Sequence, residues 1–203
     1  MTPLPHIPSG LRRTVAVVAV LNLAYFFVEF AVARRIGSVS LLADSIDFLE
    51  DASVNLLILL ALGWSLRARS RMGLLLAAVL LLPGLATLWM AWQKFQVPLA
   101  PAALPLSLAG TGALAVNLLC AFLLARYRSG AGSLTKAAFL SARNDAVANV
   151  AIIAAAGATV LTQSGWPDLV VGLAIAAMNA DAALEVWQEA RRESRLLTSE
   201  SQV

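Results

Sequence analysis

The chain has 203 residues, of which 60% are hydrophobic and only 13% are charged, and its mean hydropathy is +0.78. This charge content is about half of what a soluble domain carries, so the polar groups are too few to cover a water-soluble globule. The composition therefore excludes a water-soluble domain and predicts an integral membrane protein.

Apolar runs predict six membrane-spanning helices, because one span needs about 20 residues. The predicted spans cover residues 14–33, 41–66, 72–92, 103–125, 137–161 and 168–187. The second and fifth contain polar residues, which a span tolerates when they face the bundle interior or a water-filled cavity. We expect an all-α membrane protein with six transmembrane helices: a tail at 1–13, a transmembrane domain at 14–187, and a second tail at 188–203.

The basic residues test this topology independently. Eleven of the fifteen Lys and Arg residues fall on the side that carries both termini, three fall opposite, and Arg143 lies inside a span. The eleven are Arg12, Arg13, Arg67, Arg69, Arg71, Arg126, Arg128, Lys136, Arg191, Arg192 and Arg195, and the three are Arg34, Arg35 and Lys94. This bias predicts that both termini are cytoplasmic.

The excess of basic residues can be explained without nucleic-acid binding. The sequence has a net charge of +3 and a pI near 9.6. Basic residues in short cytoplasmic loops orient a membrane protein and contact anionic lipid headgroups. We therefore expect membrane lipid as the partner and a bacterial-type inner membrane as the location, with several passes through it.

The second predicted span begins with the sequence LLADSIDFLED, residues 41–51, which holds four carboxylates. On a helix, Asp44, Asp47, Glu50 and Asp51 all lie on one arc, with Asp47 and Asp51 one turn apart. Asp44 lies near the start of the span, where a carboxylate complements the helix dipole, so a helix-terminal role is as good an interpretation for it as a functional one. Asp47 and Asp51 lie deeper, where an ionised carboxylate costs about 2.5–3.5 kcal/mol, so we expect a compensating cation.

The fifth predicted span aligns Ser141, Asp145 and Asn149 at four-residue intervals, which puts three oxygen-bearing side chains on one stripe. This stripe could face the acidic arc of the second span. Arg143 is the one basic residue at comparable depth, and it points about 160° away from Asp145. A single Arg cannot neutralise three carboxylates, although it can pair with a Glu on another helix.

A divalent cation between the two spans would balance the remaining charge. Carboxylates at i and i+4 can converge on one ion, and a facing helix can supply the third and fourth oxygens. Protons can replace the ion when it leaves, and a site that accepts either is the chemistry of an exchanger. From the residues alone, structural polar packing and a purely protonic relay stay open as alternatives.

The segment SLLADSIDFLED, residues 40–51, resembles the second-span signature of the cation diffusion facilitator family. In that signature the two metal ligands fall on Asp47 and Asp51. The resemblance extends along the chain, because Asn22 and Glu29 are similar to the polar positions of the family's first span. It implies a six-span homodimer that exports divalent transition metals from the cytoplasm in exchange for protons.

Two features depart from the family pattern. Ser141 and Asp145 match the fifth-span ligand pair, but the family usually has His or Asp where this chain has Ser141. Typical members also carry a cytoplasmic domain after the sixth span, whereas only QEARRESRLLTSESQV follows Trp187. The resemblance therefore implies a short member that lacks this C-terminal domain.

A homodimer of such a short member would have to form through the membrane part. Gly172, Ala176 and Ala180 give the sixth span a face of small residues suited to close helix contact. Packing within one chain is an equally good interpretation of that face.

The expected function is export of a divalent transition metal, with Zn²⁺, Mn²⁺ or Fe²⁺ as substrate, H⁺ as counter-ion, and no prosthetic group. Oxygen ligands favour Mn²⁺ and the resemblance favours Zn²⁺, so the sequence does not separate them. The expected metal ligands are Asp47, Asp51 and Asp145, with Ser141 and Asn149 as candidates for the fourth. The expected charge network or proton pathway comprises Asp44, Glu29, Glu50 and Arg143.

Two other functions stay open from the sequence. One is a degenerate relative that kept the fold and lost transport together with one ligand. The other is a proton-coupled carrier of an organic cation, which would use the same carboxylates as counter-ions. We do not expect an enzyme, because no nucleophile, base and orienting partner occur together.

Overall fold

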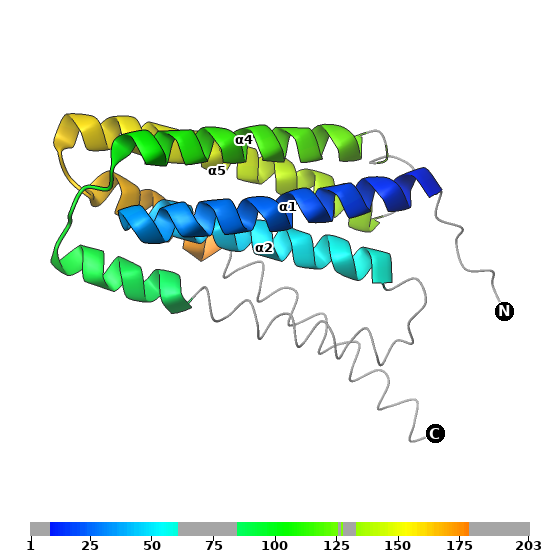
Figure 1. Ribbon diagram of the computed structural model, residues 1–203, viewed down its shortest axis with the longest axis horizontal. Coiled ribbons are helices and arrows are strands. Elements are labelled where there is room, and N and C mark those ends of the chain that lie inside the picture. Colours follow the sequence, from blue (N-terminus) through cyan, green and yellow to red (C-terminus); the bar gives the residue numbers. More distant parts are fainter. Residues whose placement is uncertain (1–8, 61–84, 126, 128–132, 179–203) are drawn as a thin grey trace, which may run out of the picture.

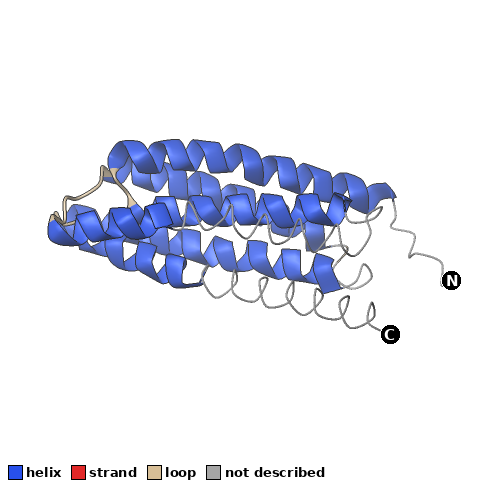
Figure 2. Cartoon of the chain, turned by 90° about the horizontal axis from the view of Figure 1, so that it is seen from below, coloured by secondary structure: helices blue, strands red, loops and turns tan. Residues whose placement is uncertain are grey.

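The computed structural model describes residues 9–60, 85–125, 127 and 133–178. The described chain is helical, with short connections at one end (Figure 2). Four helices have the bounds α1 Ser9–Ile36, α2 Val39–Leu60, α4 Ala103–Ala125 and α5 Ser133–Thr162. Two further helical segments cover 85–96 and Trp166–Met178, here called helix 85–96 and helix 166–178.

Each of these six helices overlaps one of the six predicted spans. The predicted span at 103–125 coincides with α4, and α1 and α5 extend the predicted first and fifth spans at both ends. Residues 61–66, 72–84 and 179–187 of the other predicted spans lie outside the described residues. The prediction of cytoplasmic termini stays a prediction.

The helices form a bundle in which α1 packs against α2 and α4, and α5 packs against α4 and α2 (Figure 1). One core cluster brings residues of α1, α2, α4, α5 and helix 166–178 together. Its buried members are Ala33, Leu41, Leu42, Ala43, Leu106, Ala109, Ile152, Ala156 and Ile175. The first half of α2 therefore lies at the centre of the bundle.

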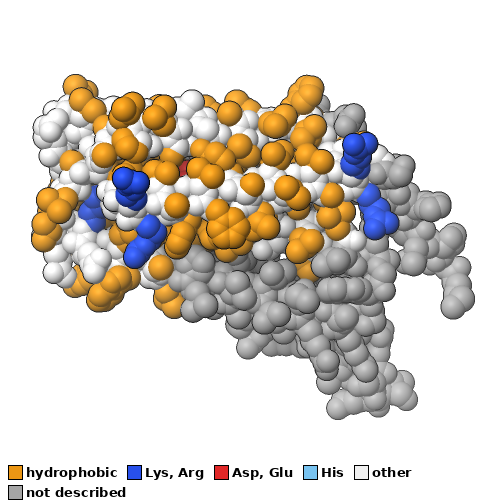
Figure 3. Space-filling view, viewed as in Figure 1, with side chains coloured by type: hydrophobic (Ala, Val, Ile, Leu, Met, Phe, Trp, Pro, Cys, Tyr) orange, Lys and Arg blue, Asp and Glu red, His pale blue; other side chains and the backbone are white. Residues whose placement is uncertain are grey.

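The surface of the bundle is apolar, as a lipid environment requires. Within the described part of the chain, three helical stretches are long and apolar enough to cross a membrane: Gly10–Ile36, Ala103–Ala125 and Ser141–Thr162. One face of the molecule shows mostly hydrophobic side chains, with Lys and Arg near both ends (Figure 3). Although its second half is strongly apolar, α2 does not meet this criterion, because its first half holds four carboxylates.

The connection between α1 and α2 is a turn of two residues. Gly37 adopts a positive φ of 65°, and the Ser38 amide donates to the Ala33 carbonyl at 3.1 Å, which together close the C-terminus of α1. The Ser38 hydroxyl then accepts a hydrogen bond from the Leu41 amide at 3.2 Å and caps the N-terminus of α2. We call the end of the bundle that holds this turn the turn end.

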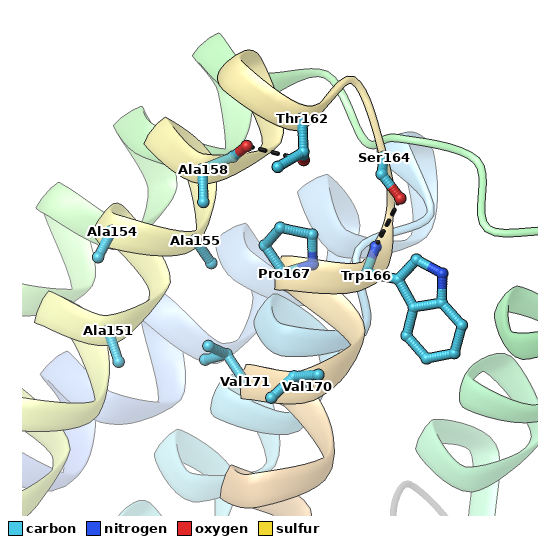
Figure 4. Close-up of a pocket in the computed structure, with 10 residues that line it drawn as sticks. All are labelled: Ala151, Ala154, Ala155, Ala158, Thr162, Ser164, Trp166, Pro167, Val170 and Val171. Carbon is cyan, nitrogen blue, oxygen red and sulfur yellow. Dashed lines mark hydrogen bonds between the residues drawn. The ribbon is translucent and has the colours of Figure 1, made fainter.

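Two more connections lie at the turn end: residues 97–102, before α4, and residues 163–165, after α5. The Gly165 amide donates to the Pro98 carbonyl at 3.0 Å, so these connections touch. The Ser164 hydroxyl accepts from the Trp166 amide at 3.3 Å and caps helix 166–178 (Figure 4). Beside this cap, α5 and helix 166–178 border an open apolar groove of about 680 Å³.

Helix 166–178 packs tightly on α2 through the face of small residues. A Cβ placed on Gly172 would lie 2.7 Å from the Ser40 amide nitrogen and the Val39 carbonyl carbon. Ala176 packs against the core cluster, and Ala180 lies outside the described residues. Gly172 is therefore used for contact within the chain, and the predicted homodimer loses this support and stays a prediction.

Candidate functional site

The acidic half of α2 and the polar stripe of α5 border one pocket of about 160 Å³. Helix 166–178 contributes its last described residue to the lining. The lining residues are Asp47, Glu50, Asp51, Ser141, Asn144, Asp145 and Met178. The predicted arc and the predicted stripe therefore face each other, and they bring three aspartates and one glutamate to the same space.

Asp51 connects three helices across this site. Its Oδ1 accepts a hydrogen bond from the Ser141 hydroxyl at 2.9 Å, and its Oδ2 lies 3.5 Å from the Asn22 amide nitrogen. The Asn22 carbonyl oxygen in turn accepts from the Cys120 thiol at 3.6 Å. Both donors to Asp51 are uncharged, so its negative charge is not balanced by them.

The register between α1 and α2 places a second pair of carboxylates next to the pocket. The two helices run antiparallel, and Asn22 of α1 lies beside Asp51 of α2. Glu29, seven residues after Asn22, therefore lies beside Asp44, which is seven residues before Asp51. Glu29 and Asp44 are fully buried side by side, and apart from each other they have no hydrogen-bond partner among the described residues. Asp44 is thus buried inside the bundle and does not cap α2.

Two predicted residues do not line the pocket themselves. The Asn149 amide nitrogen donates to the Asp145 backbone carbonyl at 2.7 Å, and Asn149 is absent from the residues that line the pocket. Arg143 is exposed and donates to the Asn144 side-chain oxygen at 3.2 Å. The structure does not bring Arg143 to Glu29, and among the described residues it forms no ion pair with Glu50 either.

The pocket carboxylates are not drawn together into a finished metal site. Among the described residues, no three His, Cys, Asp or Glu side chains stand close enough to hold a metal ion. Asp51 already uses one oxygen for Ser141 and the other for Asn22. A cation that entered this pocket would therefore have to reorient at least the Asp51 side chain to gain its third carboxylate.

Sequence reasoning missed a second charged cluster, at the turn end. Asp168, at the start of helix 166–178, forms an ion pair of 2.6 Å with Lys94, and both side chains are buried. Asp168 also accepts hydrogen bonds from Ser38 and Ser40. The available signal was that a lone Lys after the third predicted span and a lone Asp at the start of the sixth fall on the same side of the membrane.

Apolar helices around an internal pocket of carboxylates define the class of this protein: a multi-pass membrane protein that handles cations. The chain belongs to the cation diffusion facilitator family, because residues 15–193 match that family's cation efflux transmembrane domain. This membership confirms the resemblance, implies cation transport, and places the protein among transporters rather than enzymes. No curated protein matches the chain.

Proposed function

We propose that the protein exports a divalent transition metal ion, Zn²⁺, Mn²⁺ or Fe²⁺, from the cytoplasm in exchange for protons. The observation that carries this proposal is that Asp47, Asp51 and Asp145 border one pocket, and that none of the described residues lining it is basic. Carboxylates at membrane depth need a compensating cation. A transported ion supplies that charge without a resident Lys or Arg.

We assign the ligand roles to Asp47, Asp51 and Asp145, with Ser141 as the fourth oxygen donor. The Ser141 hydroxyl donates a hydrogen bond to Asp51, whereas the Asn149 side-chain amide donates to the Asp145 backbone carbonyl within α5. A shell of carboxylate and hydroxyl oxygens suits Mn²⁺, while the affinity order of divalent metals favours later ions such as Zn²⁺. Both ions are therefore substrates to be compared in the same assay.

The counter-transported protons require groups that can hold a proton when no metal is present. The three aspartates of the pocket meet this requirement, because metal binding needs them deprotonated. We add Glu29 and Asp44, which are fully buried beside each other and have no basic partner among the described residues. Glu50 lines the pocket and completes the set of acidic groups in contact with the site.

Proteoliposomes with a pH-sensitive dye inside test this exchange. Zn²⁺ or Mn²⁺ added outside should drive protons out of vesicles that contain the protein, because one carboxylate site cannot hold both ions at once. Asp51→Ala should abolish the flux. Asn144→Ala, which changes an uncharged residue of the same pocket, should retain it. Absence of metal-driven proton flux with Zn²⁺, Mn²⁺, Fe²⁺, Co²⁺ and Cd²⁺ would contradict the proposal.

The apparent metal affinity should fall as the medium is acidified, since protons compete with the metal for the same carboxylates. Each displaced proton lowers the affinity by up to about tenfold per pH unit in the range where it is exchanged. Calorimetric titration of the purified protein between about pH 5.5 and 8 measures this dependence. An affinity that does not change over this range would show that metal binding displaces no protons.

A further inference from the structure

Asp168 accepts hydrogen bonds from five donors although it is fully buried. The hydroxyls of Ser38 and Ser40 donate to its Oδ1 at 2.6 Å each, and the Ser40 amide donates to the same oxygen at 3.3 Å. The Val39 amide donates to Oδ2 at 2.9 Å, and Lys94 donates to Oδ2 at 2.6 Å. Asp168 thus binds the N-terminal amides of α2 from another helix, where a negative charge complements the helix dipole.

Lys94 is the positive half of the same network. It is 6% exposed, and its Nζ also donates to the Gly37 carbonyl at 2.8 Å. A buried ion pair repays its desolvation only when the remaining donors and acceptors are satisfied by good geometry. Here the partners include the turn between α1 and α2, so Lys94 connects helix 85–96 to that turn. We call Ser38, Ser40, Lys94 and Asp168 the turn-end network.

The turn-end network joins three parts of the chain that are far apart in the sequence. Beside it, Val39 of α2, Ala91 of helix 85–96 and Leu169 of helix 166–178 form a buried apolar cluster. Gly172 allows helix 166–178 to approach the start of α2 so closely that a Cβ would meet its backbone at 2.7 Å. Charged, apolar and backbone contacts therefore hold the same three segments together.

This network closes one end of the bundle next to the candidate cation site. Residues 38–46 are all buried, whereas Asp47, Glu50 and Asp51 are only partly buried. The pocket and the network lie on the same helix, and seven residues, or about two turns, separate Ser40 from Asp47. Any movement of the start of α2 away from helix 166–178 would therefore open this end of the bundle beside the pocket.

We propose that Asp168 and Lys94 are positioning residues for transport, which keep the pocket closed toward the turn end until the network opens to release the cation. This inference rests on the proposed passage of a cation through the pocket. In the predicted topology the turn end is extracytoplasmic, so the network closes the exit side. The fold holds this closure with charge-assisted hydrogen bonds, which are stronger than neutral ones.

The test removes the network without leaving an unpaired buried charge. The double variant Lys94→Met/Asp168→Asn removes both charges together, which avoids the penalty of a single buried ion. The reporter is Asn144→Cys, placed on an exposed residue of the pocket lining, in a chain whose single cysteine is replaced by Cys120→Ala. A membrane-impermeant thiol reagent is applied to proteoliposomes from either side. The orientation of the protein in the vesicles is determined by protease digestion of a terminal tag.

With the parent network, we expect the reporter thiol to react from the side opposite to the turn end. The double variant should raise the rate of reaction from the turn-end side by at least about tenfold, since several hydrogen bonds to charged groups are lost. The rate from the other side should stay within about twofold. The Zn²⁺ or Mn²⁺ affinity, measured by calorimetry, should also stay within about twofold, because the pocket ligands are untouched.

Two results would overturn the inference. An equal rise from both sides would mean that the network only stabilises the fold, and no rise from the turn-end side would mean that it does not close the pocket.

A disulfide between Val39→Cys and Leu169→Cys provides a second test, since it locks the same contact. It should stop metal-driven proton flux until it is reduced. If the parent itself binds no metal and drives no flux, the proposed function fails, while the two reaction rates still decide whether the network closes this end.

Discussion

Asp168 and Asp51 are the same side chain in two different surroundings within one bundle. Asp168 accepts hydrogen bonds from five donors, one of which is the ammonium group of Lys94. Asp51 has two uncharged neighbours, Ser141 and Asn22, and shares its pocket with further carboxylates. Among the described residues, the fold thus supplies a cation where a carboxylate holds helices together, and no basic side chain lines the pocket.

This difference separates a structural carboxylate from one that awaits a ligand. An ion pair that is complete within the chain cannot also hold an exchangeable ion without breaking. Carboxylates without a basic partner are costly in the empty protein and gain when a cation arrives. We therefore expect substitution of Asp168 mainly to lower the stability of the fold, and substitution of Asp51 mainly to weaken metal binding.

Stability should show the largest contrast. Asp168→Ala leaves the buried Lys94 without its partner, and such a loss costs about 3–5 kcal/mol. Asp51→Ala loses its hydrogen bond to Ser141, worth about 1 kcal/mol, and it relieves repulsion within the pocket. Unfolding in detergent without metal should therefore show a large loss of stability for Asp168→Ala and a small change for Asp51→Ala. Equal losses for the two variants would contradict the distinction.

Metal affinity should show the reverse order. Asp47→Ala, Asp51→Ala and Asp145→Ala each remove one proposed ligand, and each should weaken binding by at least about 100-fold. Asn144→Ala removes an uncharged side chain from the same pocket and should change the affinity by less than about threefold. Calorimetry on folded variants measures both. If all three aspartate variants bind metal like the parent, the ligands lie elsewhere in the chain.

The close packing beside the turn-end network gives a third contrast. A Cβ at Gly172 would lie 2.7 Å from the backbone of Val39 and Ser40, whereas a Cβ at Gly157 would meet nothing within 4 Å. Gly172→Ala should destabilise the protein by about 1–3 kcal/mol through overpacking. Gly157→Ala should be neutral or slightly stabilising, because Ala favours a helix over Gly. Thermal unfolding of the two variants provides the comparison, and an equal response would mean that helix 166–178 can shift to accept the added methyl group.

Local patterns predicted those parts of the molecule that depend on nearby residues. The span at 103–125 coincides with α4, because that apolar run has sharp ends. The arc containing Asp51 and the stripe containing Ser141 followed from helical periodicity, and the structure brings the two together. Asn149 departed from the predicted pocket because a backbone carbonyl one turn earlier offers its amide a nearer partner.

The pairing of Lys94 with Asp168 could not be predicted in the same way. The two residues are 74 positions apart, and each alone looks like an ordinary charge at the edge of a membrane. Their contact depends on how closely helix 166–178 approaches α2, and no periodicity encodes that distance. The same limit applies to Arg143, whose predicted partners were inferred from depth alone.

Ser141 offers the finest distinction between a working pocket and a degenerate one. Its hydroxyl contacts Asp51, and Ser141 lies one helical turn from Asp145. A metal-ligating side chain at this position would therefore bind the same ion as both aspartates. Ser141→His would place an imidazole there, and nitrogen ligands favour Zn²⁺ over harder ions. We expect the ratio of Zn²⁺ to Mn²⁺ affinity to rise by about tenfold, measured by competition calorimetry, with Asn144→His as the control for an added imidazole elsewhere in the pocket.

If the parent drives no proton flux with any of the tested metals while Ser141→His does, the parent is a degenerate relative and the missing ligand is the cause. If the ratio does not change, Ser141 lies outside the ligand shell, and its contact with Asp51 only orients that carboxylate.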